Sequence, residues 1–218
     1  MSRYFIEVAY KGTNYAGFQI QDNANTIQAE MEKALATYFR DPINLTGSSR
    51  TDAGVHARQN FFHFDSDKPV NYPNLSKSVY HLNAILPGDI VVKSLRLVND
   101  TAHSRFDAIS RTYEYTTYNA KDPFLQGTAY FFPFQVDKEL LQQFASELVN
   151  HTQFEAFSKR STQVHTFNCN IHNSEWISNA EILVYRVTAN RFLRGMVKGL
   201  AGTMLRCAKK GYSLEQFR

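Results

Sequence analysis

The structured part of the chain begins with Arg3-Tyr4-Phe5-Ile6-Glu7-Val8-Ala9-Tyr10, in which large apolar side chains recur at every second position. Tyr4, Ile6 and Val8 therefore share one face of an extended strand. The polar residues 11–14 then form a turn that ends this strand. The sequence thus predicts a half-buried strand near the N-terminus.

A helix is predicted next, over about residues 26–40, because the spacing of apolar residues changes to three or four positions. Its core-facing stripe comprises Ile27, Met31, Leu35 and Tyr38 or Phe39. Asn25, followed three positions later by Gln28, is expected to cap the first turn.

Four more elements complete the first half of the chain. We expect two strands at 43–46 and 59–64, a helix at about 74–84 and a strand at 90–97. The order β-α-β-β-α-β is that of the split βαβ, ferredoxin-like unit.

The second half repeats this order without its last strand. After a connector at 98–107, we expect two strands, at 111–119 and about 128–134, and then a helix at 138–149. A hairpin of two strands, 167–177 and 181–189, and a long helix at 192–209 follow. Ser213-Leu214-Glu215-Gln216 is typical of a capping box that opens a further helix. We therefore expect an α+β protein of two ferredoxin-like lobes, residues 1–107 and 108–218, with antiparallel sheets and a C-terminally incomplete second lobe.

Composition indicates a globular protein, since 43% of the 218 residues are hydrophobic and no long apolar run occurs. The N-terminus lacks a signal-peptide pattern, and Cys169 and Cys207 do not form a disulfide framework. We therefore expect a cytoplasmic location.

Positive charge gathers towards the C-terminus. From residue 191 onward a single acidic residue, Glu215, stands against Arg191, Arg194, Lys198, Arg206, Lys209, Lys210 and Arg218. With a sequence pI near 9.0, this distribution favours a polyanion such as nucleic acid as the partner.

The greatest density of reactive groups lies in Ser49-Arg50-Thr51-Asp52-Ala53-Gly54-Val55-His56, between two predicted strands. It combines a guanidinium, a carboxylate and an imidazole around one glycine. On local chemistry alone, Asp52-Ala53-Gly54 can be read as an ordinary turn in which glycine supplies a positive φ. The other interpretation is an active-site loop held by a rigid scaffold.

The segment Arg-Thr-Asp-x-Gly-Val-His resembles the signature of the TruA family of tRNA pseudouridine synthases. The resemblance implies that Asp52 is the catalytic residue. It extends to Tyr10-Lys11-Gly12-Thr13-Asn14-Tyr15 followed by Gly17-Phe18-Gln19, which is similar to the family's N-terminal motif. Ser49 departs from the family, which often has glycine there.

A second motif combines Arg105-Phe106-Asp107-Ala108 with Arg111-Thr112-Tyr113-Glu114-Tyr115. On a strand, Arg111, Tyr113 and Tyr115 share one face, which either stacks bases and binds phosphate or simply covers a half-buried sheet. The resemblance implies that Tyr113 lies against the target uridine as an acid or base.

A third motif is Asn190-Arg191-Phe192-Leu193-Arg194-Gly195-Met196-Val197-Lys198. On the expected helix, Arg191, Arg194 and Lys198 would form one basic stripe, which is either a solvated face or the lining of a cleft. The segment is similar to the family motif Phe-Leu-x-x-Met-Val-Arg. This implies that Leu193 packs on the active site, while Lys198 replaces the usual arginine.

The resemblance implies isomerisation of uridine to pseudouridine in tRNA, by a homodimer that binds RNA in a central cleft and uses no ATP, metal or redox cofactor. The resemblance also implies a uridine in the anticodon arm, at about positions 38 to 40. Such a uridine must leave the helical stack, and we assign Arg50 to fill the gap or hold the flipped nucleotide. Asp52 acts as nucleophile at C1′ or as base at the 2′ position. The alternatives are a non-catalytic RNA-binding protein, which would gain nothing from Asp52, and a nucleoside hydrolase, which would need a second acidic partner.

Overall fold

The computed structural model describes residues 1–67, 74–159, 166–179 and 181–218 of the chain. It shows a mixed α+β protein that divides into two compact units, Met1–Ala108 and Ile109–Arg218. No helix in the described part of the chain is both long and apolar enough to cross a membrane.

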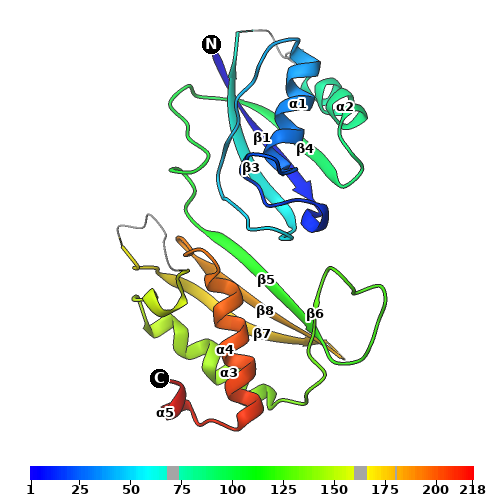
Figure 1. Ribbon diagram of the computed structural model, residues 1–218. Coiled ribbons are helices and arrows are strands. Elements are labelled where there is room, and N and C mark those ends of the chain that lie inside the picture. The colour runs from blue at the N-terminus through cyan, green and yellow to red at the C-terminus, as the bar shows by residue number, and fades with distance from the viewer. Residues whose placement is uncertain (68–73, 160–165, 180) are drawn as a thin grey trace. The chain divides into compact units, whose positions relative to one another are not determined.

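The first unit has a four-stranded antiparallel sheet in the order β2-β3-β1-β4, with α1 and α2 on one face (Figure 1). Its elements, in chain order, are β1 (Ser2–Tyr10), a 3₁₀ turn (Gly12–Asn14), α1 (Ile27–Phe39), β2 (Thr46–Gly47), β3 (Ala57–Ser66), α2 (Leu75–Ile85) and β4 (Ile90–Val98). The predicted order of strands and helices in this half is confirmed.

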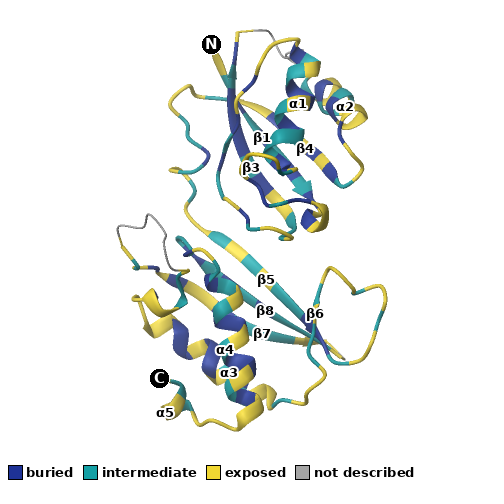
Figure 2. Ribbon diagram, in the orientation of Figure 1, coloured by how far each residue is buried: buried dark blue, intermediate teal, exposed yellow. Residues whose placement is uncertain are grey.

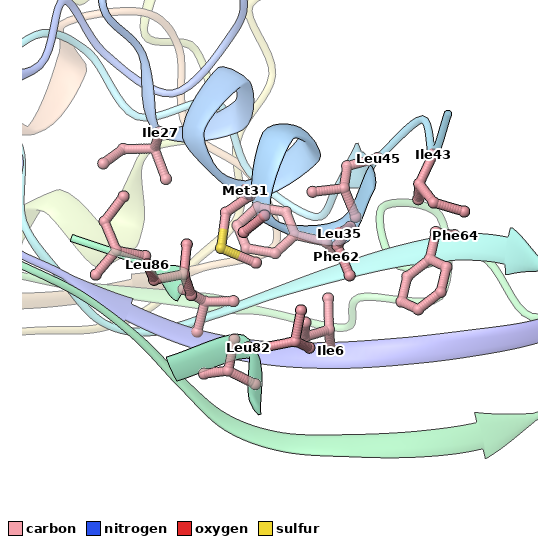
Figure 3. Packing of buried hydrophobic residues seen from close by; sticks show 14 of the residues in the cluster. Ile6, Ile27, Met31, Leu35, Ile43, Leu45, Phe62, Phe64, Leu82 and Leu86 are labelled. Atoms are coloured by element: carbon pink, nitrogen blue, oxygen red, sulfur yellow. The ribbon is translucent and has the colours of Figure 1, made fainter. Parts of the chain in front are cut away.

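The core of this unit lies between the sheet and its two helices. In the β1–β3 register, Tyr4 lies opposite Phe64 and Ile6 opposite Phe62, so the predicted apolar face of β1 is buried. Figure 3 shows Ile6, Phe62 and Phe64 of the strands in one cluster with helix residues that include Met31 and Leu35 of α1 and Leu82 of α2. The predicted stripe of α1 is confirmed, with Phe39 as its last buried member.

Two local predictions for this unit are wrong. The side chain that caps α1 belongs to Thr26, whose hydroxyl accepts a hydrogen bond from the Ala29 amide, and not to Asn25. The strand expected at 43–46 is reduced to Thr46–Gly47, because α1 side chains satisfy the Leu45 backbone: its N–H donates to a Glu32 carboxylate oxygen and its carbonyl accepts from the Gln28 amide.

The second unit has the strand order β6-β5-β8-β7, with α3 and α4 on one face (Figure 1). Its main elements are β5 (Arg111–Tyr118), β6 (Tyr130–Phe131), α3 (Lys138–Glu147), β7 (Ile171–Asn179), β8 (Ile182–Ala189), α4 (Met196–Lys210) and α5 (Leu214–Phe217). Figure 2 shows buried residues along one side of α4 and exposed residues along the other. The predicted buried positions Leu141, Phe144 and Leu148 are confirmed.

Several boundaries in this unit differ from the prediction. The strand expected at 128–134 is only Tyr130–Phe131 and runs parallel to β5, and β7 begins at Ile171. The long helix begins at Met196, not at residue 192. Gly195 has φ of 77°, a left-handed conformation that is incompatible with the helix interior and therefore sets its start.

The capping box at the C-terminal end is confirmed. The Ser213 hydroxyl accepts from the Gln216 amide, the Gln216 side chain accepts from the Ser213 amide, and α5 follows. Phe217 of this short helix stacks on Phe144 of α3 at 4.3 Å between ring centroids.

A buried histidine ties the end of the first unit to its sheet. His63 of β3 accepts a hydrogen bond at Nδ1 from the Ser104 amide, and the Ser104 hydroxyl donates to the Thr46 carbonyl. Burial, followed by the neighbouring His103, lowers the pKa of His63. The folded protein thus favours the neutral imidazole.

The depressed pKa of His63 predicts an acid-dependent loss of stability. The imidazole of His63 binds a proton more readily in the unfolded state than in the folded one. The contribution of His63 to the free energy of unfolding is therefore complete above about pH 6.5 and falls as the pH drops towards the lower pKa of the folded state. His63→Asn keeps an acceptor but cannot titrate, so its melting temperature should fall less between about pH 7.5 and about pH 5. His172→Asn, at an exposed position, should follow the wild type, and identical profiles for His63→Asn and wild type would contradict the assignment.

Candidate active site

The Asp52 segment forms a tight turn in the first unit. The Val55 amide donates to the Asp52 carbonyl at 3.1 Å, and Gly54 has φ of 75°. The turn with a positive φ at glycine, which both interpretations of this segment allow, is therefore present. The turn leaves Asp52 half-buried and Arg50 exposed, so a carboxylate is presented from a constrained backbone.

The loop that follows β1 supports this turn through main-chain atoms. The Phe18 amide donates to the Thr51 carbonyl at 3.0 Å, and the Gly54 amide donates to the Tyr15 carbonyl at 3.4 Å. On the other side of the turn, the Gly12 amide donates to Nδ1 of His56 at 3.0 Å. Nδ1 of His56 is therefore the acceptor in this contact.

Two glycines make this close approach possible. A Cβ at Gly12 would lie 2.1 Å from the Val55 carbonyl oxygen, and one at Gly17 would lie 2.9 Å from the Thr51 carbonyl oxygen. Gly17 also has φ of 109°, which larger residues adopt poorly. The sequence carried this signal in its N-terminal motif, but it did not identify the surface against which the glycines pack.

A buried polar network fixes the start of the turn. The hydroxyls of Tyr10 and Thr51 are 2.8 Å apart, and the Asn60 amide donates to the Tyr10 oxygen at 3.2 Å. The Asn60 carbonyl oxygen in turn accepts from the hydroxyls of Ser48 and Ser49 at 2.8 and 3.0 Å. The network immobilises Thr51 next to Asp52, because buried polar groups are costly to leave unpaired.

A second layer holds the supporting loop. The Tyr15 hydroxyl donates to a carboxylate oxygen of Asp89 at 2.6 Å, and the Lys11 amide donates to the Asp89 carbonyl at 2.9 Å. Burial, together with the hydrogen bond to Asp89, raises the pKa of Tyr15. The phenol therefore remains a donor, and the loop after β1 stays joined to the start of β4.

In the second unit, the structure brings the Arg111–Tyr115 part of the second motif next to the third motif. The Arg111 guanidinium donates to the Asn190 carbonyl at 2.9 Å, and the Asn190 side-chain oxygen accepts from the Arg191 amide at 2.8 Å. The Tyr113 ring meets the Phe192 ring edge-on at 5.1 Å. The first residues of β5 and the segment after β8 thus form one cluster.

Tyr113 and Tyr115 of β5 are half-buried. Tyr113 and Tyr115 lie opposite Val187 and Tyr185, which are completely buried, and both pack against the helix-covered core. Burial raises the pKa of Tyr115. Both rings are thus half-buried, as the interpretation of a half-buried sheet expects, and each keeps part of its surface exposed.

The predicted basic stripe is wrong. Arg191 and Arg194 precede α4, and Lys198 lies within it, so the three residues do not share a helix face. Leu193 is buried and its carbonyl accepts from the Met196 amide, whereas Arg194 and Lys198 are exposed. The turn at Gly195 separates these cations.

Comparison with known proteins identifies the family. A relative named tRNA pseudouridine synthase A, from Parabacteroides distasonis, is 40% identical over 218 residues, which are all of this chain and 86% of the relative. The chain belongs to the tRNA pseudouridine synthase A family. A relative of the same name from Porphyromonas gingivalis is 40% identical over 100% of this chain and 87% of its own length. Another, from Staphylococcus aureus, is 35% identical over 95% of this chain and 78% of its own length. A family profile described as tRNA pseudouridine synthase matches residues 144–218.

The close approach of Gly12 to the Val55 backbone predicts that a larger residue at position 12 destabilises the protein. Gly12→Ala must displace the Val55 backbone, so we expect a loss of about 1 to 3 kcal/mol in the free energy of unfolding. Urea titration measures this loss, and hydrogen exchange should show faster opening of the Val55 amide. Gly88→Ala is the matched control, because its Cβ would enter open space. Equal behaviour of the two variants would contradict the packing argument.

Proposed function

We propose that this chain converts uridine to pseudouridine in tRNA, with Asp52 as the catalytic residue. The observation that carries the proposal is a family signature, Arg50 to His56, on a turn that two layers of hydrogen bonds hold in place. Such preorganisation is what a reacting carboxylate needs. Membership of the family supplies the reaction class.

In the proposed reaction, the bond from N1 to C1′ breaks, the uracil turns, and C5 bonds to C1′. Asp52 either attacks C1′ or removes the 2′ proton. After the new bond forms, C5 loses its proton and N1 gains one, so the product is an isomer. We assign this proton exchange to Tyr113, whose ring is held by Phe192.

We also propose that the substrate uridine lies in the anticodon arm, at about positions 38 to 40, and that Arg50 fills the space that it leaves on flipping out. Arg50 is exposed, as this role requires. Arg111 is assigned to phosphate, and Arg191, or alternatively Lys198, to the charge of Asp52. Leu193 supports this cluster from the core, and the exposed Arg194 and Lys198 are assigned to the RNA backbone.

The larger assembly is part of the same proposal. The order and pairing of the first unit's strands support a ferredoxin-like lobe, and β5, α3, β7, β8 and α4 follow the same order in the second. From the family resemblance, we also propose a central cleft for RNA. A homodimer in the cytoplasm completes the proposal.

Asp52→Asn tests the assignment directly. It preserves shape but removes the negative charge, so we expect pseudouridine formation to fall to background while tRNA affinity is unchanged or slightly higher. Carbodiimide primer extension on treated tRNA gives the readout, with Asp22→Asn, at an exposed position, as the control. Activity retained by Asp52→Asn would contradict catalysis, and loss of tRNA binding with an intact fold would favour a non-catalytic RNA-binding protein.

Tyr113→Phe separates the hydroxyl from the ring. The variant keeps the edge-on contact with Phe192, so the fold and tRNA affinity should persist while the single-turnover rate drops about 100-fold or more, as for loss of an acid or base. Tyr113→Ala should also lower the melting temperature. A rate for Tyr113→Phe equal to that of the wild type would leave Tyr113 a packing residue only.

A further inference from the structure

Phe106 is a large aromatic residue with no cover in the first unit. Its side chain is 77% exposed, and one face of its ring stacks on the His103 imidazole, with 4.1 Å between centroids and 27° between planes. A stacked pair of this kind holds one ring face down and leaves the other available.

The loop that presents this ring is tightly closed. The Asp107 amide donates to the His103 carbonyl at 3.0 Å, and a carboxylate oxygen of Asp107 accepts from the His103 amide at 2.7 Å. Nδ1 of His103 accepts from the amides of Arg105 and Phe106 at 3.2 and 3.3 Å. Hydrogen bonds among these four residues thus hold the imidazole against the Phe106 ring.

The stack continues into the core. The His103 ring meets the His63 ring edge-on at 4.6 Å, and His63 is buried under Ser104. A column of three rings therefore leads from the interior of the sheet to the surface at Phe106. The exposed ring is preorganised, so a flat ligand that covers it orders little else.

Phe106 differs in exposure from the tyrosines of the same motif. The sequence pattern of Tyr113 and Tyr115 was consistent with base stacking, but the structure half-buries both rings in the second unit's core. Phe106 belongs to the same motif as these tyrosines but is far more exposed, at 77%.

We propose that Phe106 is a stacking platform for an unpaired base of the tRNA substrate. The ligand class follows from the chemistry, because every nucleobase has a π-face that an exposed aromatic ring accepts without sequence preference. The inference rests on the proposed function for its ligand, tRNA, and adds a contact distinct from that of the Asp52 carboxylate with the reacting uridine.

Binding of unmodified tRNA to Phe106 variants of the full chain tests the proposal. Phe106→Ala should weaken binding about 5- to 150-fold, which corresponds to about 1 to 3 kcal/mol for one stacked base. Phe106→Trp should retain or improve affinity, and Phe106→Leu should be weakened despite its apolar side chain. The slope of affinity against salt should stay at the wild-type value for all three, because no phosphate contact is lost, whereas Arg194→Ala should reduce it.

Phe124 is the matched control, since it is a phenylalanine that is 90% exposed in the second unit. Phe124→Ala should bind tRNA as the wild type does. Wild-type affinity in Phe106→Ala, equal losses in both alanine variants, or a changed salt slope in Phe106→Ala would each overturn the proposal.

Fluorescence gives a readout that does not depend on the alanine variant folding. The chain has one tryptophan, Trp176, so Phe106→Trp adds a single new emitter. Stacking of a base should quench the added emission when tRNA is titrated, and Phe124→Trp should show no such quenching. Absence of quenching in Phe106→Trp at saturating tRNA would overturn the platform. The binding and fluorescence measurements on the Phe106 variants require tRNA binding but no chemistry. Turnover retained by Asp52→Asn would therefore refute the catalytic assignment of Asp52 and leave the Phe106 proposal standing.

Discussion

The hydrogen bond between the Tyr10 and Thr51 hydroxyls is the contact on which the proposed site depends. It joins the end of β1 to the residue before Asp52, and it is buried, so neither hydroxyl can turn to water instead. Asn60 of β3 holds the same tyrosine oxygen. Two neighbouring strands of the sheet therefore determine where the Asp52 turn starts, and the turn inherits their rigidity.

Backbone approach is the second constraint around the site. Gly12 and Gly17 let the loop after β1 lie directly against residues 51–55, and Asp89 holds that loop through Tyr15. The carboxylate is thus supported by main-chain atoms from a loop whose own position depends on β4. Support of this kind resists displacement better than flexible side chains do, because few rotatable bonds separate it from the sheet.

Sequence periodicity was a good guide wherever one face of an element is buried by its own side chains. The stripes of β1, α1 and α3 are examples, since a two- or 3.6-residue period is needed to bury one face. It failed where distant groups decide the backbone. Side chains of Glu32 and Gln28 form hydrogen bonds with the Leu45 backbone, so the predicted strand there is shorter. Gly195 adopts a left-handed φ, so α4 begins after Arg194.

By itself, the sequence determined the α+β class, the order of the main elements, and the family, because these follow from periodicity and from a local run of residues between Arg50 and His56. Only the tertiary structure decided which side chains are packing groups and which are presented to a ligand. Tyr113 and Phe106 belong to one motif, yet one ring lies against the core and the other stands on His103 in solvent. That difference depends on contacts between strands and loops that are distant in sequence, and no local pattern encodes them.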